Sequence, residues 1–217
     1  MTAHPLRDRL IGGVQALGLL LSDAQTQQLL DYLDLLGKWN KVYNLTAVRD
    51  PAEMLTHHLL DSLAVVGPLR RHTRGSAIRS LDVGSGGGLP GVVIAICCPE
   101  TDVTCVDAVA KKAAFIQQAA GALGLSNLRG LHARVESVTS VFDVITSRAF
   151  ATLADFTAWS SGARAADGVW MAMKGKHPAD EIAALPATMD VFHVEQLVVP
   201  SLDAERCLIW MRPRGVV

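Results

Sequence analysis

Cysteine and aromatic residues are scarce in this chain of 217 residues. The four cysteines show no Cys-x-x-Cys spacing and lie within apolar runs, which argues against a disulfide framework and a zinc site, so we expect no metal. Only 5% of the residues are aromatic, which predicts an interior filled by aliphatic side chains. No apolar stretch is long enough to span a membrane, and no signal-peptide core follows the first residues. We therefore expect a cytoplasmic protein that does not bind membranes.

Neither sign of charge dominates the chain. It carries 20 basic and 21 acidic residues, a net charge of -1. This balance argues against a protein that coats nucleic acid by bulk charge, although it permits a local basic face. Half of the residues are hydrophobic, which excludes global disorder. Length and composition together indicate one domain of enzyme size, with room for a short extension.

Residues 1–75 carry a helical pattern. The segment Ser22-Asp23-Ala24-Gln25 matches a capping box, which predicts the start of a helix. Leucines follow it at helical spacing, namely Leu29, Leu30, Leu33 and Leu36. Gly37 is expected to end or loosen this helix.

A second helix is predicted after Asp50 and Pro51, which suit a helix cap and a first turn. The pair Gly67-Pro68 is expected to close it. The segment 70–76 is polar, basic and rich in turn residues, so it is the best candidate for a linker. We therefore expect a helical extension over residues 1–75.

From residue 76 onwards, short apolar runs alternate with alanine-rich helical segments. Strands are predicted at 78–83, 103–106, 142–146, 169–173, 191–199 and 207–211, with 127–132 as a weaker seventh, and helices at 90–98, 110–123 and 153–166. This alternation predicts an α/β fold with a mainly parallel sheet. No helix separates the last two strands, so they are expected to pair as a terminal antiparallel hairpin. Residues 76–217 would form this main domain.

A glycine-rich loop follows the first predicted strand. It has the sequence LDVGSGGGLPG at 81–91 and can be aligned with two ligand patterns. The register that starts at Asp82, with Gly84, Gly86 and Gly88, is the S-adenosylmethionine pattern. The register Gly86-x-Gly88-x-x-Gly91 also satisfies the dinucleotide fingerprint, which is weak evidence on its own.

Two carboxylates bear on the choice between these registers. Asp107 lies 19 residues after Gly88 (107 − 88) at the end of the second predicted strand, where it is expected to bind ribose hydroxyls. Asp82 lies inside the loop, where a carboxylate suits a cationic methyl donor and would repel a pyrophosphate. Asp82 therefore favours the methyl donor, although a strand-end Asp bonded to loop amides remains an alternative.

Six short segments together resemble the bacterial small-subunit rRNA guanine-N7 methyltransferases. They are WNKVYNLTA at 39–47, HLLDSL at 58–63, DVGSGGGLPG at 82–91, RVE at 134–136, SRAFA at 147–151 and MKG at 173–175. The resemblance implies a Rossmann-like methyltransferase fold with an N-terminal helical extension and S-adenosyl-L-methionine as donor. It also implies that the acceptor is a guanine in the 530 loop of 16S rRNA of the small ribosomal subunit.

The resemblance also implies site residues. Gly84 and Leu89 would contact the donor through the glycine loop, and Val135 and Glu136 would border its adenine. Arg148, at the end of the fourth predicted strand, would face both donor and substrate. Separately from the resemblance, we expect a monomer.

The chemistry of guanine N7 fits the residues available. This nitrogen bears an in-plane lone pair and no proton, so no general base is required and none is evident. Arg148 is our first candidate for a contact to guanine O6 or to a neighbouring phosphate, and Lys174 is the second. For either residue the alternative is a solvated cation at a strand end.

Other interpretations remain open from the sequence. A nicotinamide-dependent oxidoreductase would use the Gly86 register, and a non-catalytic rRNA-binding assembly factor would keep only the fold. Five N-terminal residues are candidates for RNA contacts, namely Lys38, Lys41, Arg49, His57 and His58. For His58, capping or a hydrogen bond to Asp61 competes about evenly with a role in RNA binding.

Overall fold

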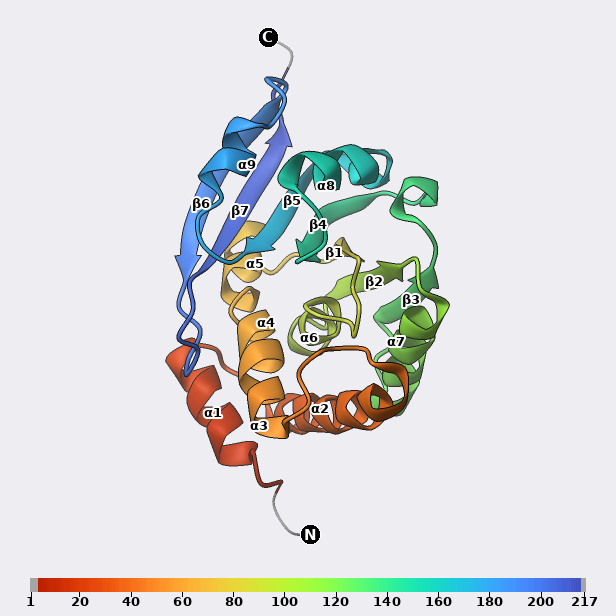
Figure 1. Cartoon of the computed structure of the whole chain (residues 1–217), viewed down its shortest axis with the longest axis vertical. Helices are drawn as coiled ribbons and strands as arrows, with labels where there is room; N and C mark the ends of the chain where they lie inside the picture. Colours follow the sequence, from red (N-terminus) through yellow and green to blue (C-terminus); the bar gives the residue numbers. More distant parts are fainter. Residues whose placement is uncertain (1–3, 216–217) are drawn as a thin grey trace.

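A computed structural model describes residues 4–215 of the chain. A seven-stranded sheet has the strand order β3-β2-β1-β4-β5-β7-β6 (Figure 1). Its parallel strands are β1 (Ile78–Val83), β2 (Thr101–Asp107), β3 (Leu128–His132), β4 (Phe142–Arg148) and β5 (Arg164–Lys174). The strands β6 (Met189–Leu197) and β7 (Arg206–Pro213) pair antiparallel with each other, and β7 also pairs antiparallel with β5. The predicted α/β fold, mainly parallel sheet and terminal hairpin are confirmed.

Helices cover both faces of the sheet and enclose two hydrophobic cores. The helices α6 (Gly91–Cys97) and α7 (Ala110–Leu123) lie on one face together with the N-terminal helices, and α8 (Leu153–Ser160) lies on the other (Figure 1). The short helix α9 (Ala179–Ala183), which the sequence pattern did not predict, also contacts α8. The 3-10 turns η2 (Val135–Ser137) and η3 (Ser161–Ala163) complete this side. The helix predicted over 153–166 is shorter than expected, because η3 follows α8 directly and β5 begins at Arg164.

The N-terminal helices pack on the sheet domain. They are α1 (Arg7–Ala16) and the long helix α2 (Asp23–Tyr43). The capping box is confirmed, because the Gln25 amide donates to the Ser22 hydroxyl (3.2 Å) and the Ser22 amide donates to the Gln25 side chain (3.0 Å). Gly37 was expected to end or loosen this helix, and the first alternative was wrong, because α2 continues to Tyr43. Trp39 packs edge-on against Phe115 of α7, and such packing outweighs the cost of one helical glycine, about 1 kcal/mol.

The second helical region is interrupted by a π-helix. It comprises α3 (Pro51–Met54), the π-helix η1 (Leu55–Leu60) and α4 (Asp61–Leu63). Its start is confirmed, because Asp50 accepts hydrogen bonds from the amides of Ala52 and Glu53.

A further helix, α5 (Val66–Thr73), contains Gly67 and Pro68 in its first turn, where proline lacks only an amide that would have no helical partner. Most of the expected linker is therefore helical. Arg70 donates to the carbonyl of Cys97 and Leu69 is buried, so tertiary contacts hold this polar segment in a helix. The division of the chain into 1–75 and 76–217 stays a prediction. Among residues 4–215, no helix is both long and apolar enough to span a membrane.

Candidate active site

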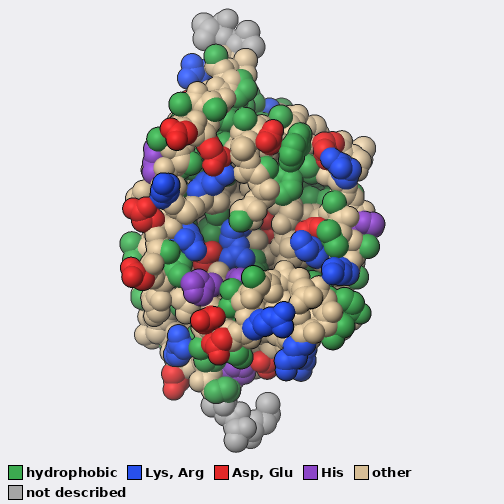
Figure 2. Space-filling model, viewed as in Figure 1, with side chains coloured by type: hydrophobic (Ala, Val, Ile, Leu, Met, Phe, Trp, Pro, Cys, Tyr) green, Lys and Arg blue, Asp and Glu red, His purple; other side chains and the backbone are tan. Residues whose placement is uncertain are grey.

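Two adjoining cavities lie at the edge of the sheet where the parallel strands end. Ligand sites in such sheets form at this edge because the carboxyl ends of the strands meet there. The larger cavity has a volume of about 480 Å³ and the smaller about 160 Å³, and Gly84 lines both. Figure 2, viewed as in Figure 1, shows a hollow at the centre of the molecule with Lys, Arg and His side chains around it.

The glycine loop between β1 and α6 adopts left-handed backbone angles at three positions. The φ values are 64° at Gly84, 58° at Gly86 and 87° at Gly88. A Cβ atom at Gly84 would lie 2.2 Å from a ring carbon of Phe150, and one at Gly88 would lie 2.4 Å from a methyl group of Val92. A Cβ at Gly86 would meet no protein atom closer than 4.0 Å. The outer glycines are therefore required by packing, while Gly86 presents bare backbone to the larger cavity.

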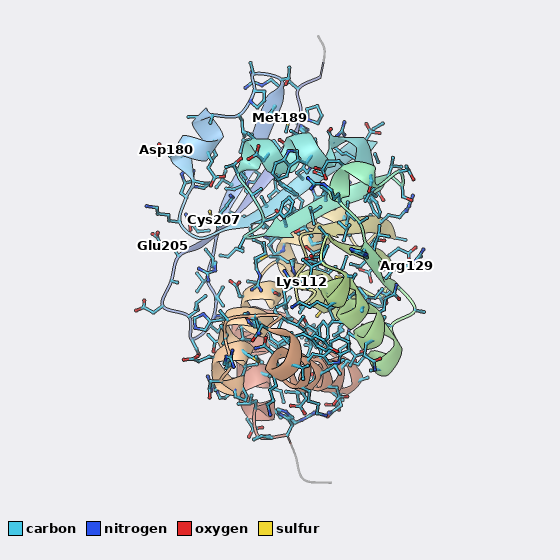
Figure 3. All side chains as sticks on the ribbon, turned by 45° about the vertical axis from the view of Figure 1, so that its right-hand side comes forward. Lys112, Arg129, Asp180, Met189, Glu205 and Cys207 are labelled. Carbon is cyan, nitrogen blue, oxygen red and sulfur yellow. The ribbon has the colours of Figure 1, made fainter. Side chains whose placement is uncertain are left out.

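Asp107 lies beside this loop, as its spacing predicted. It is the last residue of β2 and is buried. One carboxylate oxygen accepts from the Gly86 amide (3.0 Å) and the other from the Val109 amide (2.9 Å), with the Lys112 Nζ at 3.7 Å. Figure 3 shows Lys112 at the start of α7. Each carboxylate oxygen keeps further lone-pair capacity, so the group can still accept from ligand hydroxyls at the smaller cavity, which it lines.

Asp82 lies beneath the loop and lines neither cavity. It is fully buried, and one carboxylate oxygen accepts from the Gly91 amide at 2.9 Å. The other oxygen has no hydrogen-bond partner among the described residues. Burial raises the pKa of Asp82 to about 7. This position agrees with the alternative in which a strand-end Asp binds loop amides, and direct donor contact by Asp82 stays a prediction.

Arg148 ends β4 and lines the larger cavity, as expected. Its Nη1 donates to the carbonyl oxygen of His57 and to Oδ2 of Asp61, both at 2.9 Å. Arg206 donates from Nε to Oδ1 of the same Asp61 at 2.7 Å. The strand β7 runs antiparallel to β5, so its first residue, Arg206, lies at the edge where the parallel strands end. Figure 3 labels Glu205 and Cys207, the residues on either side of it.

The π-helix η1 forms the opposite wall of this cavity with His57 and His58. Single π-helical turns are rare and often accompany functional sites. His58 is buried, and its Nε2 hydrogen-bonds the Thr46 hydroxyl at 2.7 Å, while Nδ1 has no partner among the described residues. The expected alternative of a hydrogen bond to Asp61 is therefore replaced by one to Thr46. Burial and then the nearby Arg148 charge lower the pKa of His58 to about 4.

Lys174 ends β5 and also lines the larger cavity. Its Nζ donates to both carboxylate oxygens of Glu181, at 3.0 and 2.8 Å, and to the carbonyl of Ala151 at 2.9 Å. These contacts use all three ammonium donors and neutralise the charge. Lys174 is therefore a weaker candidate for substrate contact than Arg148.

The smaller cavity has apolar walls. Val135 is buried and Glu136 is exposed at its rim, so both expected residues line it. Phe150 and Trp159 also line it, with their rings edge to face at a centroid separation of 5.9 Å. Leu89, the other expected loop contact, lines the larger cavity instead. An apolar slot of this kind suits a flat heterocycle.

Sequence reasoning missed Arg206 and the role of Asp61 in this site. Asp61 falls within a quoted segment, but Arg206 belongs to no motif, and the two are 145 positions apart. The only available signal for Arg206 was its place directly before the strand predicted at 207–211, which was expected to pair antiparallel.

The donor groups present fit S-adenosylmethionine. Asp107 offers a carboxylate for paired hydroxyls, the apolar smaller cavity suits adenine, and the bare loop at Gly86 allows close approach. The Ser85 hydroxyl at the larger cavity is buried without a partner among residues 4–215, which leaves a polar group available to a ligand. Fold and site together define a class I S-adenosylmethionine-dependent methyltransferase.

Solved structures share this fold. A 1,6-didemethyltoxoflavin-N1-methyltransferase from Burkholderia thailandensis aligns with a TM-score of 0.57 at 16% identity, over 85% of this chain and 90% of that one. TrmN from Thermus thermophilus aligns with a TM-score of 0.56 at 19% identity, over 70% of this chain and 48% of that one. At these identities the likeness concerns the fold alone.

Sequence comparison shows the family. The family model described as rRNA small subunit methyltransferase G matches residues 25–209. The ribosomal RNA small subunit methyltransferase G of Acidovorax ebreus is 72% identical over 218 aligned positions, which cover 97% of this chain and 95% of that protein. The chain belongs to the rRNA small subunit methyltransferase G family. This membership confirms the resemblance and sets aside the oxidoreductase and non-catalytic alternatives.

Proposed function

We propose that this enzyme transfers a methyl group from S-adenosylmethionine to N7 of a guanine in the 530 loop of 16S rRNA. The observation that supports this proposal most is a pair of adjoining cavities beside the glycine loop and Asp107, in which Arg148 and Arg206 line the larger cavity and pair with Asp61, the carboxylate found there among residues 4–215. Asp61 is bound by two arginines, and the pKa of His58 is about 4, so neither is poised to remove a proton near neutral pH. An acceptor that carries a lone pair and no proton fits this wall.

The donor half of the site would bind through the glycine loop, one carboxylate and an apolar slot. The backbone at Gly84 and Gly86 would approach the ligand, Asp107 would accept from the ribose hydroxyls, and Val135 with Phe150 would enclose the adenine. Bound there, S-adenosylmethionine supplies an electrophilic methyl group on a sulfonium. The apolar slot and the loop would fix its orientation, because positioning accounts for most of the catalysis when no proton moves.

Arg148 would orient the acceptor. Its Nη1 is held by Asp61 and the His57 carbonyl, whereas its Nε and Nη2 make no hydrogen bond within residues 4–215. Those two groups would donate to guanine O6 or to a neighbouring phosphate, which leaves N7 free to attack. We expect this reaction to take place in the cytoplasm, on the small subunit or its rRNA, with a monomeric enzyme.

Mass spectrometry of rRNA tests this function most directly. RNA from cells lacking the protein should lose one methyl group on a guanine of the 530 loop, and purified enzyme with S-adenosylmethionine should restore it in vitro. Naked 16S rRNA and 30S subunits are tried in parallel. Restoration of a methyl group on another nucleotide, or on a guanine atom other than N7, would overturn the assignment.

A further inference from the structure

Asp61 connects three distant parts of the chain at the acceptor side of the cavity. It belongs to α4, directly after the π-helix, and its side chain is 3% exposed. One carboxylate oxygen binds Arg148 of β4 at 2.9 Å and the other binds Arg206 of β7 at 2.7 Å. Both arginine side chains are largely buried, with about a fifth of each exposed.

The charges around Asp61 do not balance within the cluster. Two guanidinium groups share one carboxylate, which leaves one positive charge on the cavity wall. Lys174, which also lines this cavity, is neutralised by Glu181. A buried charge is strongly destabilising without its partner, so Asp61 sets where both arginines can lie.

The contacts of Arg148 are confined to one end of its guanidinium. Nη1 is tied to Asp61 and to the His57 carbonyl, and this carbonyl comes from the π-helix that precedes Asp61. Two fixed acceptors on one nitrogen define the plane of the guanidinium group, and they leave Nε and Nη2 of this cavity-lining residue without a partner among residues 4–215. The planar group can present two parallel donors only in such a fixed orientation.

We propose that Asp61 is a positioning residue for the methyl transfer, acting through Arg148. Arg206 supports it by binding the second carboxylate oxygen, which stops the carboxylate from rotating away from Arg148. The proposal rests on the proposed function, since it assumes that Arg148 orients the RNA acceptor. The alternative is a purely structural role for Asp61, in which the same ion pairs only hold the N-terminal helices against the sheet.

A double-mutant cycle separates these two roles. Asp61→Asn keeps the shape but places an amide donor against one guanidinium, so we expect single-turnover methylation at saturating RNA to slow about 10- to 100-fold. The affinity for S-adenosylmethionine, measured by calorimetry, should change little. In an Arg148→Ala background, Asp61→Asn should slow the rate by less than about twofold. Full additivity of the two replacements would overturn the proposal.

A second pair of variants deals with stability. Asp61→Asn leaves Arg206 without its partner, so it should lower the melting temperature. Adding Arg206→Gln removes that unpaired charge and should restore much of the melting temperature without restoring the methylation rate. Recovery of the rate together with the stability would show that Asp61 is merely structural.

Asp190 provides a matched control. It pairs with Arg212 across β6 and β7 at 3.0 Å, and neither residue lines either cavity. Asp190→Asn should leave the methylation rate unchanged. The position of the methyl group in the wild-type product, read by mass spectrometry, reports separately on the proposed function. A product on another nucleotide would refute that function while the cycle still decides the role of Asp61.

Discussion

Replacing Gly86 by alanine tests the glycine loop with the least disturbance to the protein. Gly86 has a left-handed φ of 58°, which costs a residue with a side chain about 1 kcal/mol. The new methyl group would meet no protein atom closer than 4.0 Å, so no steric penalty is added within the protein. Because the residue lines the larger cavity, the methyl group would enter the space assigned to the donor.

The expected result is a loss of donor affinity beyond the loss of stability. We expect S-adenosylmethionine to bind Gly86→Ala at least tenfold more weakly, about 1.4 kcal/mol, in calorimetric titrations. Gly124→Ala is the matched control, since Gly124 has a φ of 66°, no atom within 4 Å of the added Cβ, and no place in either cavity. Both variants should lose similar stability, but only Gly86→Ala should lose affinity. Equal donor affinity in the two folded variants would refute the placement of the donor on this loop.

Four further outcomes follow from the site and the fold. Arg148→Ala should slow single-turnover methylation by one to three powers of ten, about 1.4–4 kcal/mol, with donor affinity retained, and Arg148→Lys should recover only part of it. The chemical step at saturating substrates should be nearly flat between about pH 6.5 and 8.5, and a rate that follows one ionisation would contradict a base-free mechanism. Burial lowers the pKa of His58 from 6.5 to about 4, so its contribution to stability is complete above pH 6.5 and is lost as the pH falls through 4. Urea denaturation of wild type should therefore show a steeper loss over that range than His58→Gln, by up to about 3 kcal/mol, and equal slopes would contradict the shifted pKa. Gly37→Ala should raise the free energy of unfolding by about 0.5–1 kcal/mol, because Gly37 lies inside α2 with open space around the added methyl group.

The sheet was predictable because its signals are local. Short apolar runs bounded by turn residues located all seven strands, and β1 matches its predicted bounds of 78–83. The capping box at Ser22 and the cap at Asp50 also depend on neighbouring residues only. Errors arose where distant contacts override local preference, as at Gly37, where the α2 helix continues because Trp39 packs against α7.

The two halves of the candidate site also differed in how far the sequence predicted them. The donor half follows from a loop and from Asp107 at a fixed spacing along the chain, and the hydrogen bond from the Gly86 amide confirms that they meet. The spacing did not show that Asp82 lies beneath the loop, because alternation along β1 and burial by β2 and α6 decide which way it faces. On the acceptor side, Arg206 depends on the order of strands in the folded sheet, which no local pattern encodes.

The donor half and the acceptor half of the site are built from different parts of the chain, which bears on how the enzyme would select its acceptor. The smaller cavity and the glycine loop come entirely from residues 83–159, whereas the larger cavity also takes walls from the loop after α2, from the π-helix and from β7. His57 and Asp61 reach Arg148 from the N-terminal helices and fix its guanidinium group, whose Nε and Nη2 make no hydrogen bond within the described chain. The N-terminal helices would therefore act as part of the acceptor site in addition to covering one face of the sheet. Changes in the π-helix should consequently alter RNA methylation while donor binding, which depends on other residues, is preserved.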